Sequence, residues 1–149
     1  MKIGLICSSG GHFLQLYSLK EFLEKREHFW VTFDAKDTSS LLKNENVFYA
    51  YSPTNRNIIN FLRNLILAFR ILKSQKPDMI VSTGAGVVVP FVYIAKLFRI
   101  KTLYIESITR SKDISLSGKM VYPFTDHFLV QWPELEKRYK RAKFTGQVI

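Results

Sequence analysis

Short apolar runs alternate with longer amphipathic segments along most of the chain. The apolar runs are rich in β-branched and aromatic residues, which is typical of strands. Runs that are apolar throughout, such as Met79–Val81, suit a sheet that is covered on both faces. Six strands are predicted in this way: Lys2–Cys7, Phe29–Phe33, Val47–Tyr51, Asp78–Ser82, Lys101–Ile105 and His127–Val130.

The segments between the strands space their apolar residues as helices do. A long helix is predicted over Asn57–Lys76, and it stops at Pro77 because proline cannot continue the hydrogen-bond ladder. Another helix is predicted over Val87–Phe98, where Pro90 is tolerated in the first turn. The first helix of the chain is predicted from a set of apolar residues at helical spacing: Leu14, Leu16, Tyr17, Leu19, Phe22 and Leu23.

This alternation predicts the α/β class, with a Rossmann-like parallel sheet flanked by helices. The chain has 149 residues and no internal repeat, low-complexity tract or linker, so residues 1–149 are predicted to form a single domain. Hydrophobic residues make up 47% of the chain and charged residues 23%, which supports a packed core. Ligands of such sheets bind at the carboxyl ends of the strands, where the strand order reverses, so we expect binding chemistry in the loops there.

The charge of the chain favours an anionic partner. Lysine and arginine number 22 and aspartate and glutamate 12, which gives a net charge of +10 and a pI near 9.8. Such an excess suits a phosphate-bearing substrate, an anionic lipid surface, nucleic acid or an acidic protein. The single cysteine, Cys7, excludes an internal disulfide framework, and with only 3 histidines it argues against a structural zinc site. No metal or cofactor is expected.

The location of the protein follows from the absence of two signals. The sequence shows no signal peptide, and no segment of about 20 residues is apolar enough to span a bilayer. The protein is therefore expected to be soluble or peripheral to a membrane, in a reducing, cytosolic setting.

The first candidate site is the glycine-rich loop Ser8–His12, between the first strand and the first helix. Gly10 and Gly11 let the backbone approach a ligand closely, and the following helix offers N–H groups to an anion. Ser9 and both glycines are candidate anion contacts, and His12 is a candidate general base or donor to phosphate. The alternative is a tight turn in which a serine caps the helix. The loop has neither the Walker ending nor the GxGxxG spacing.

Two more loops follow strands. In Ser82–Gly86, two glycines, Gly84 and Gly86, could clamp a pyrophosphate or could simply permit close packing of helix on strand. This loop and the first one should open onto the same edge of the sheet. Glu106 follows the strand Lys101–Ile105 directly and lies four residues before Arg110. Its carboxylate could act as a base, accept from a hydroxyl or form an ion pair with that arginine.

The long helix Asn57–Lys76 is strongly basic, because no acidic residue occurs between Glu45 and Asp78. One apolar face is expected to dock on the sheet: Ile58, Phe61, Leu62, Leu65, Ile66, Phe69 and Leu72.

The opposite arc of the same helix is predicted to face outward. It carries Leu67 and Ile71 beside Arg63 and Arg70. Apolar side chains bordered by arginines suit a bilayer surface, where the cations meet lipid phosphates. The alternative is a helix covered on both sides by the rest of the fold or by a partner.

The other basic cluster, Lys137–Lys143, lies near the C-terminus. It could bind nucleic acid, but no helix-turn-helix, RRM or KH pattern accompanies it. A solvated face, or one that meets a membrane or subunit, is the better interpretation, and nucleic acid is not an expected partner.

Several short motifs occur along the chain in a fixed order: Ser8–His12, Lys76–Asp78, Ser82–Gly86 with Pro90, Glu106–Ser107, Ser115–Lys119, Val130–Leu135 and Phe144–Gly146. Together, and particularly in Gln131–Glu134, they resemble the Alg14-like polysaccharide biosynthesis proteins, including the bacterial capsule and exopolysaccharide subunits of the PssD and CpsF type. The resemblance spans essentially the whole chain.

The resemblance implies the N-terminal, acceptor-binding domain of a GT-B glycosyltransferase similar to MurG. It implies inverting transfer from a UDP-sugar to a polyprenyl-diphosphate-linked acceptor in capsular or exopolysaccharide synthesis, peripherally at the cytoplasmic face of the cell membrane. The donor site would lie on a partner chain of the Alg13, PssE or CpsG type. Eukaryotic relatives carry a membrane-spanning helix with no counterpart in this sequence, so the arginine-bordered helix is the expected anchor.

The same resemblance implies a role for each candidate residue. His12 is the first candidate for the base or a diphosphate contact, and Glu106 is the second. The alternative function is a non-catalytic membrane adaptor that recruits or stabilises the catalytic subunit. The implied diphosphate pocket is formed by Ser9, Gly10, Gly11, Gly84, Gly86 and Arg110.

Overall fold

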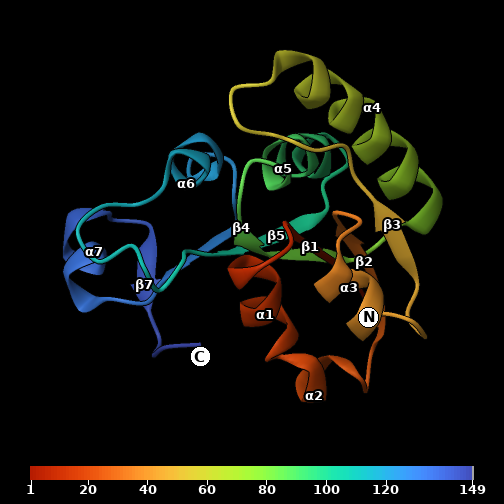
Figure 1. The fold of residues 1–149 in the computed structure, drawn as a ribbon. Coiled ribbons are helices and arrows are strands. Elements are labelled where there is room, and N and C mark those ends of the chain that lie inside the picture. The colour runs from red at the N-terminus through yellow and green to blue at the C-terminus, as the bar shows by residue number, and fades with distance from the viewer. Residues whose placement is uncertain (149) are drawn as a thin grey trace.

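A parallel sheet organises residues 1–148, the part of the chain that the computed structural model describes (Figure 1). Its seven strands are β1 (Lys2–Cys7), β2 (Glu27–Thr32), β3 (Val47–Tyr49), β4 (Met79–Gly84), β5 (Lys101–Ile105), β6 (His127–Val130) and β7 (Ala142–Phe144). They pair in the order β3-β2-β1-β4-β5-β6-β7, and every pairing is parallel. The predicted Rossmann-like sheet is confirmed.

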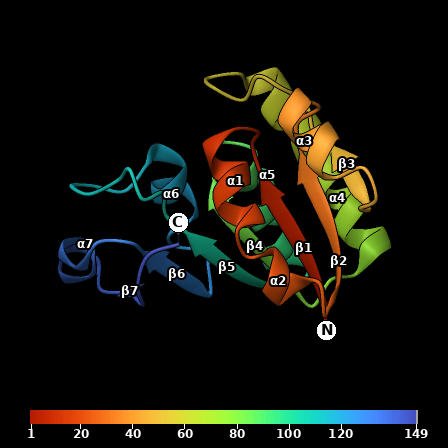
Figure 2. The same ribbon diagram turned by 60° about the horizontal axis from the view of Figure 1, so that its bottom comes forward.

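Helices cover both faces of this sheet. They are α1 (Gly11–Tyr17), α2 (Lys20–Leu23), α3 (Lys36–Leu41), α4 (Ile58–Gln75), α5 (Val88–Leu97), α6 (Leu116–Val121) and α7 (Pro133–Arg138). The first three lie on one face and α4, α5 and α6 on the other, so α1, α2 and α3 stand in front of the sheet in Figure 2. α7 packs against β6 and β7.

Two hydrophobic cores follow from this layering. Successive side chains of a strand point to opposite faces, so β1 contributes Leu5 to the core under α1 and Ile6 to the core under α4 and α5. Because both faces are covered, the strands carry apolar residues toward both cores, as the sequence pattern indicated.

The strand order reverses between β1 and β4, since the chain moves outward from β1 to β3 and then returns to the other side of β1. The loops that follow these two strands are Ser8–Gly10 and Ala85–Val87. They correspond to the two glycine-rich turns singled out in the sequence, and they flank the place where sheets of this kind bind ligands.

Some elements differ from the predictions. The first predicted helix is broken into α1 and α2 around Ser18 and Leu19, and it leaves Leu14 and Phe22 exposed. The sequence pattern also missed α3, α6, α7 and β7, which are three to six residues long. Such short elements make too few turns or alternations to produce a period. The last of them, β7, lies within the basic C-terminal cluster.

The prediction for the faces of α4 was wrong. Ile71, predicted to face outward, is 4% exposed, and Leu67 packs against the same core. The residues predicted to dock on the sheet are largely in solvent: Ile58 is 76% exposed and Ile66 56%, and Leu62 and Phe69 are also exposed. Of the predicted docking face, Leu72 is buried, and Phe61 and Leu65 are half-buried.

Two asparagines explain why the helix is turned this way. Asn64 is fully buried and pairs with the backbone of Tyr51, donating to its carbonyl (3.0 Å) and accepting from its N–H (2.9 Å). Asn60 donates to the carbonyl of Pro53 (2.8 Å). These bonds satisfy the buried amide groups of both asparagines, so the polar stripe of α4 faces the loop after β3 and apolar residues are left outside.

The corrected orientation can be tested with a matched pair of isoleucines on α4. Ile71→Ala should lower the free energy of unfolding by about 2–5 kcal/mol, because it opens a cavity in the core. Ile66→Ala should change it by less than about 0.5 kcal/mol, because the side chain is already largely in water. Urea unfolding followed by circular dichroism measures both, and equal losses in the two variants would contradict the orientation.

Candidate functional site

The loops after β1 and β4 are joined by two hydrogen bonds. Nδ1 of His12 lies 2.8 Å from the carbonyl oxygen of Thr83, and the Thr83 hydroxyl donates to the carbonyl of His12. The expectation that both glycine-rich turns open onto one edge is therefore confirmed. His12 lies at the start of α1, and Thr83 lies near the end of β4.

This contact fixes the chemistry of the His12 ring. A carbonyl oxygen can only accept, so Nδ1 must carry the proton in this bond. In the neutral ring Nε2 then holds a lone pair, and within residues 1–148 it makes no hydrogen bond. The side chain is half-buried. It thus has the orientation and the tautomer that a general base needs.

Gly84 and Gly86 make close packing possible. Gly84 has a φ of +118°, and a Cβ there would lie 3.1 Å from both the His12 ring and the Tyr104 hydroxyl. A Cβ on Gly86 would lie 3.0 Å from Oγ1 of Thr54, in the loop that leads to α4. These glycines have the packing role that the sequence left open, and they bring His12, Tyr104 and the 50–57 loop to one place.

Gly10 and Gly11 are in the opposite situation. Both are exposed, and a Cβ on either would meet no heavy atom within 4 Å. No side chain caps α1, whose N-cap is Gly10, so the predicted serine cap is absent at this helix. The N–H of Gly10 donates to Oδ2 of Asp37 (2.8 Å). The rest of this turn, with half-buried Ser9 beside it, is open to a ligand.

A buried hydroxyl group adjoins His12. The Tyr104 hydroxyl lies 3.3 Å from Oγ of Ser115 and 3.5 Å from Oγ of Ser117, at the start of α6. Burial raises the pKa of Tyr104 well above its usual range, and the nearby Glu106 charge raises it further. Tyr104 therefore remains a neutral hydroxyl at physiological pH, available to donate or accept.

Glu106 is fully buried and its carboxylate is already occupied. Oε1 accepts from the N–H of Ser107 (2.9 Å), and Oε2 accepts from the N–H (2.9 Å) and the hydroxyl (3.0 Å) of Ser115. Ser115 in turn caps α6 by accepting from the N–H of Gly118. A carboxylate held in this way cannot reach a substrate hydroxyl, so Glu106 has a positioning role in place of the predicted catalytic one.

The loop between β5 and α6 is anchored from the neighbouring strand. Nε2 of the buried Gln131 donates to the carbonyl of Glu106 (2.9 Å), and Nε1 of Trp132 donates to the carbonyl of Ile108 (2.6 Å). Arg110 of this loop is exposed, and within residues 1–148 it forms no ion pair with Glu106. Its positive charge opposes the rise in the pKa of Tyr104, so it lies within electrostatic reach of the site.

Sequence reasoning missed three of these residues as site residues. Tyr104 lies inside the predicted strand Lys101–Ile105, where only packing was considered. Thr83 lies in the candidate loop Ser82–Gly86, in which only the glycines were given a role. Ser115 belongs to the motif Ser115–Lys119, which carried the family resemblance without a role. In the part of the chain that the structure describes, no group of histidine, cysteine, aspartate and glutamate side chains is arranged to hold a metal ion.

The fold and its switch point define a Rossmann-like domain of the GT-B type. MurG of Acinetobacter baumannii matches 89% of this chain over 42% of its own, with a TM-score of 0.73 and 18% identity. UDP-N-acetylglucosamine 2-epimerase of Rickettsia bellii matches 99% over 45% of its own chain, with a TM-score of 0.77 and 15% identity. At these identities the likeness concerns the fold, which resembles the N-terminal domain of MurG.

The chain belongs to the Alg14 family: residues 49–148 match the family model described as "Oligosaccharide biosynthesis protein Alg14 like". A relative named UDP-N-acetylglucosamine transferase subunit alg14, from Schizosaccharomyces pombe, is 47% identical over 78 residues, which are 48% of this chain and 37% of the relative. The human protein of the same name is 31% identical over 98 residues, 62% of this chain and 45% of its own. The matches thus span less than half the length of these two relatives.

Two glycines allow a matched test of the Glu106 network. A Cβ on Gly118 would lie 2.3 Å from Oε2 of Glu106, and this oxygen cannot move away without breaking its bonds to Ser115. Gly118→Ala should therefore destabilise the protein by about 1–3 kcal/mol. Gly11→Ala, which meets nothing, should be neutral or stabilising by up to about 1 kcal/mol. Urea titrations measure both, and a neutral Gly118→Ala would count against the buried network.

Proposed function

We propose that this chain is the acceptor-binding and membrane-contacting subunit of a two-component inverting glycosyltransferase. The proposed reaction moves a sugar from a UDP-sugar to a polyprenyl-diphosphate-linked acceptor. The observation that carries the proposal is the His12 ring at the switch point of an Alg14-family chain, with Nδ1 bonded to Thr83 and Nε2 unbonded within residues 1–148. The names of the relatives support N-acetylglucosamine as the sugar. The capsular or exopolysaccharide setting stays a prediction.

In the proposed mechanism, Nε2 of His12 takes the proton of the acceptor hydroxyl as its oxygen attacks the anomeric carbon of the donor sugar. The bond from that carbon to the UDP oxygen breaks, the electron pair leaves with UDP, and the configuration inverts. The N–H groups of Ser9 and Gly11 and the charge of the exposed Arg110 would hold the acceptor diphosphate, while the N–H of Gly10 is already bonded to Asp37. Gly84 and Gly86 would shape the pocket by letting its walls approach.

The donor is assigned to a partner chain. The relatives are named as subunits of a UDP-N-acetylglucosamine transferase, which supports a second chain. An Alg13-, PssE- or CpsG-like subunit would supply the UDP-sugar site and complete the crevice above β1 and β4. The chain alone should then transfer little or no sugar.

The role of His12 can be tested with His127 as the matched control, since His127 is exposed at the start of β6. In the complex with its partner, His12→Ala should lower the rate of transfer from UDP-N-acetylglucosamine to a lipid-diphosphate acceptor about 10²–10⁴-fold. His127→Ala should leave the rate unchanged. A complex that kept full activity with His12→Ala would favour the non-catalytic adaptor.

The proposed membrane surface is the exposed face of α4. Arg63 and Arg70 remain on it, as the sequence predicted, but its apolar side chains are not Leu67 and Ile71. Positive side chains among exposed apolar ones suit the interface of an anionic bilayer. Among the helices of residues 1–148, none is long and apolar enough to span a bilayer. The corrected apolar set is Ile58, Ile59, Leu62, Ile66 and Phe69.

This surface begins beside the catalytic edge. The loop that leads into α4 contacts Gly86 through Thr54, and Ile58 and Ile59 follow at the start of the helix. A bilayer on this face of α4 would bring the headgroup of a lipid-linked acceptor close to the switch point. The position of α4 thus supports an acceptor that stays embedded in the membrane.

The membrane proposal predicts that Leu62→Glu with Ile66→Glu releases the protein from vesicles containing anionic lipid, because two carboxylates replace the apolar contacts. The control pair is Phe22→Glu with Leu41→Glu, exposed residues on the other face of the sheet, which carry the same change in charge. Vesicle sedimentation should show at least about tenfold weaker binding for the first pair only. If both pairs weakened vesicle binding equally, the effect would come from net charge alone, and the proposed membrane contact of α4 would be contradicted.

A further inference from the structure

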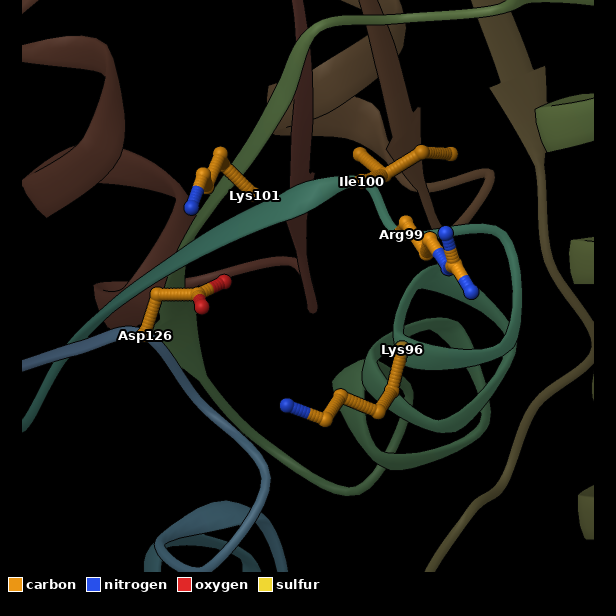
Figure 3. Close-up of a pocket in the computed structure, with 5 residues that line it drawn as sticks. All are labelled: Lys96, Arg99, Ile100, Lys101 and Asp126. Atoms are coloured by element: carbon orange, nitrogen blue, oxygen red, sulfur yellow. The ribbon is translucent and has the colours of Figure 1, made fainter.

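A basic cavity lies at the opposite, amino edge of the sheet, between the end of α5 and the start of β5 (Figure 3). It has a volume of about 370 Å³ and is lined by Lys96, Arg99, Ile100, Lys101 and Asp126. Figure 3 shows Lys96 and Arg99 on the α5 side and Lys101 and Asp126 across from them.

A second hollow of about 410 Å³ adjoins the cavity and shares Arg99 and Ile100 with it. It extends to the end of α4, where Lys73 and Lys76 add two more cations. The first hollow is called the basic cavity below, and the second the α4 groove.

The carboxylate of Asp126 offsets part of the positive charge of the basic cavity. Burial works against its ionisation, but its hydrogen bonds to Thr102 and the nearby charges of Lys101 and Lys96 lower its pKa. Oδ2 of Asp126 accepts from the N–H (2.9 Å) and hydroxyl (3.2 Å) of Thr102, and Oδ2 of Asp78 accepts from the N–H of Lys2 (2.8 Å). Within residues 1–148 no salt bridge involves any of the five cations Lys73, Lys76, Lys96, Arg99 and Lys101. Each hollow has three cations against one carboxylate, so a net positive charge remains for a ligand.

Two of these cations, Lys76 and Arg99, stand in the left-handed conformation just after the ends of α4 and α5. Lys76 follows α4 with a φ of +47°, and Arg99 follows α5 with a φ of +58°. Glycine is the usual residue in this left-handed conformation at a helix end. The helix dipole favours a cation at a helix C-terminus, but the left-handed conformation disfavours every residue that has a Cβ. A ligand that uses the cationic side chains accounts for their presence at both ends.

We propose that the basic cavity binds a phosphate group, and that this phosphate is the headgroup of an anionic membrane lipid. Both lysine and arginine bind phosphate oxygens, arginine in a bidentate geometry. A free phosphate would satisfy the same groups, so the choice of a lipid rests on what surrounds the cavity.

The apolar face of α4 leads directly to these hollows. Phe69 ends that face and packs on Phe98 of the α4 groove, with ring centroids 5.2 Å apart, and the Lys73 ammonium lies over the Phe69 ring. Leu97 beside them is 67% exposed. If α4 rests on a bilayer, as proposed above, the side chains of Phe69, Phe98 and Leu97 would lie at the boundary of the acyl chains. The adjoining cations would then contact the lipid phosphates. This lipid assignment rests on the proposed membrane contact.

The first arm of the test uses inorganic phosphate and the full chain. Titration should give saturable amide shifts in NMR spectra at Arg99–Lys101. Lys96→Gln with Arg99→Gln should abolish them, while the control pair Lys25→Gln with Lys140→Gln, which is exposed and outside the cavity, should keep them. The absence of saturable shifts in the unmodified chain, or equal loss in both pairs, would overturn the phosphate site.

The second arm identifies the source, with vesicles of phosphatidylcholine alone or with phosphatidylglycerol. The cavity pair should weaken binding to the anionic vesicles at least about tenfold, and the control pair less than about twofold. Phosphate shifts together with unchanged vesicle binding in the cavity pair would overturn the lipid assignment and make free phosphate the ligand. If the unmodified chain bound no vesicles while the shifts persisted, the membrane contact of α4 would fail and the phosphate site would stand.

Discussion

The two hydrogen bonds between His12 and Thr83 are the contact on which the rest of the site depends. They join the turns after β1 and β4 across the point where the strand order reverses, and they select the tautomer of the histidine. They need a glycine at position 84, because a side chain there would meet both the His12 ring and the Tyr104 hydroxyl. The geometry of the proposed base is thus set by backbone atoms, which a substrate cannot displace.

α4 relates this site to the proposed membrane contact. The loop that leads into α4 adjoins the glycine turn after β4 through Thr54, and the last turn of α4 reaches the α4 groove at the other edge of the sheet. One helix with an exposed apolar face therefore runs from the proposed reaction centre to the basic cavity. A bilayer lying along that face would contact the domain at both edges, which defines how the domain is oriented on the membrane and where a lipid-linked acceptor arrives.

The sheet could be predicted from the sequence, because strands that are buried on both faces are largely apolar and glycine turns follow two of them. The orientation of α4 could not, because apolar periodicity assumes that polar residues face water. Asn60 and Asn64 break that assumption, because they are buried and bond to the backbone of the preceding loop. Glu106 was misread for a related reason: its position after β5 suits a base, but only the fold shows that Ser107 and Ser115 occupy its oxygens.

The network around Glu106 shows how the proposed acceptor site could be ordered on this chain while the proposed donor site belongs to a partner. Gln131 bonds to the Glu106 carbonyl and also accepts from the N–H of Val148 (2.7 Å), so the loop after β5, the end of β6 and the C-terminal segment are fixed together. The side of the proposed acceptor pocket formed by the loop after β5 is therefore held by bonds within this chain. In the proposed enzyme the partner need only bring the sugar donor to a surface that is already arranged, so little ordering entropy opposes its association.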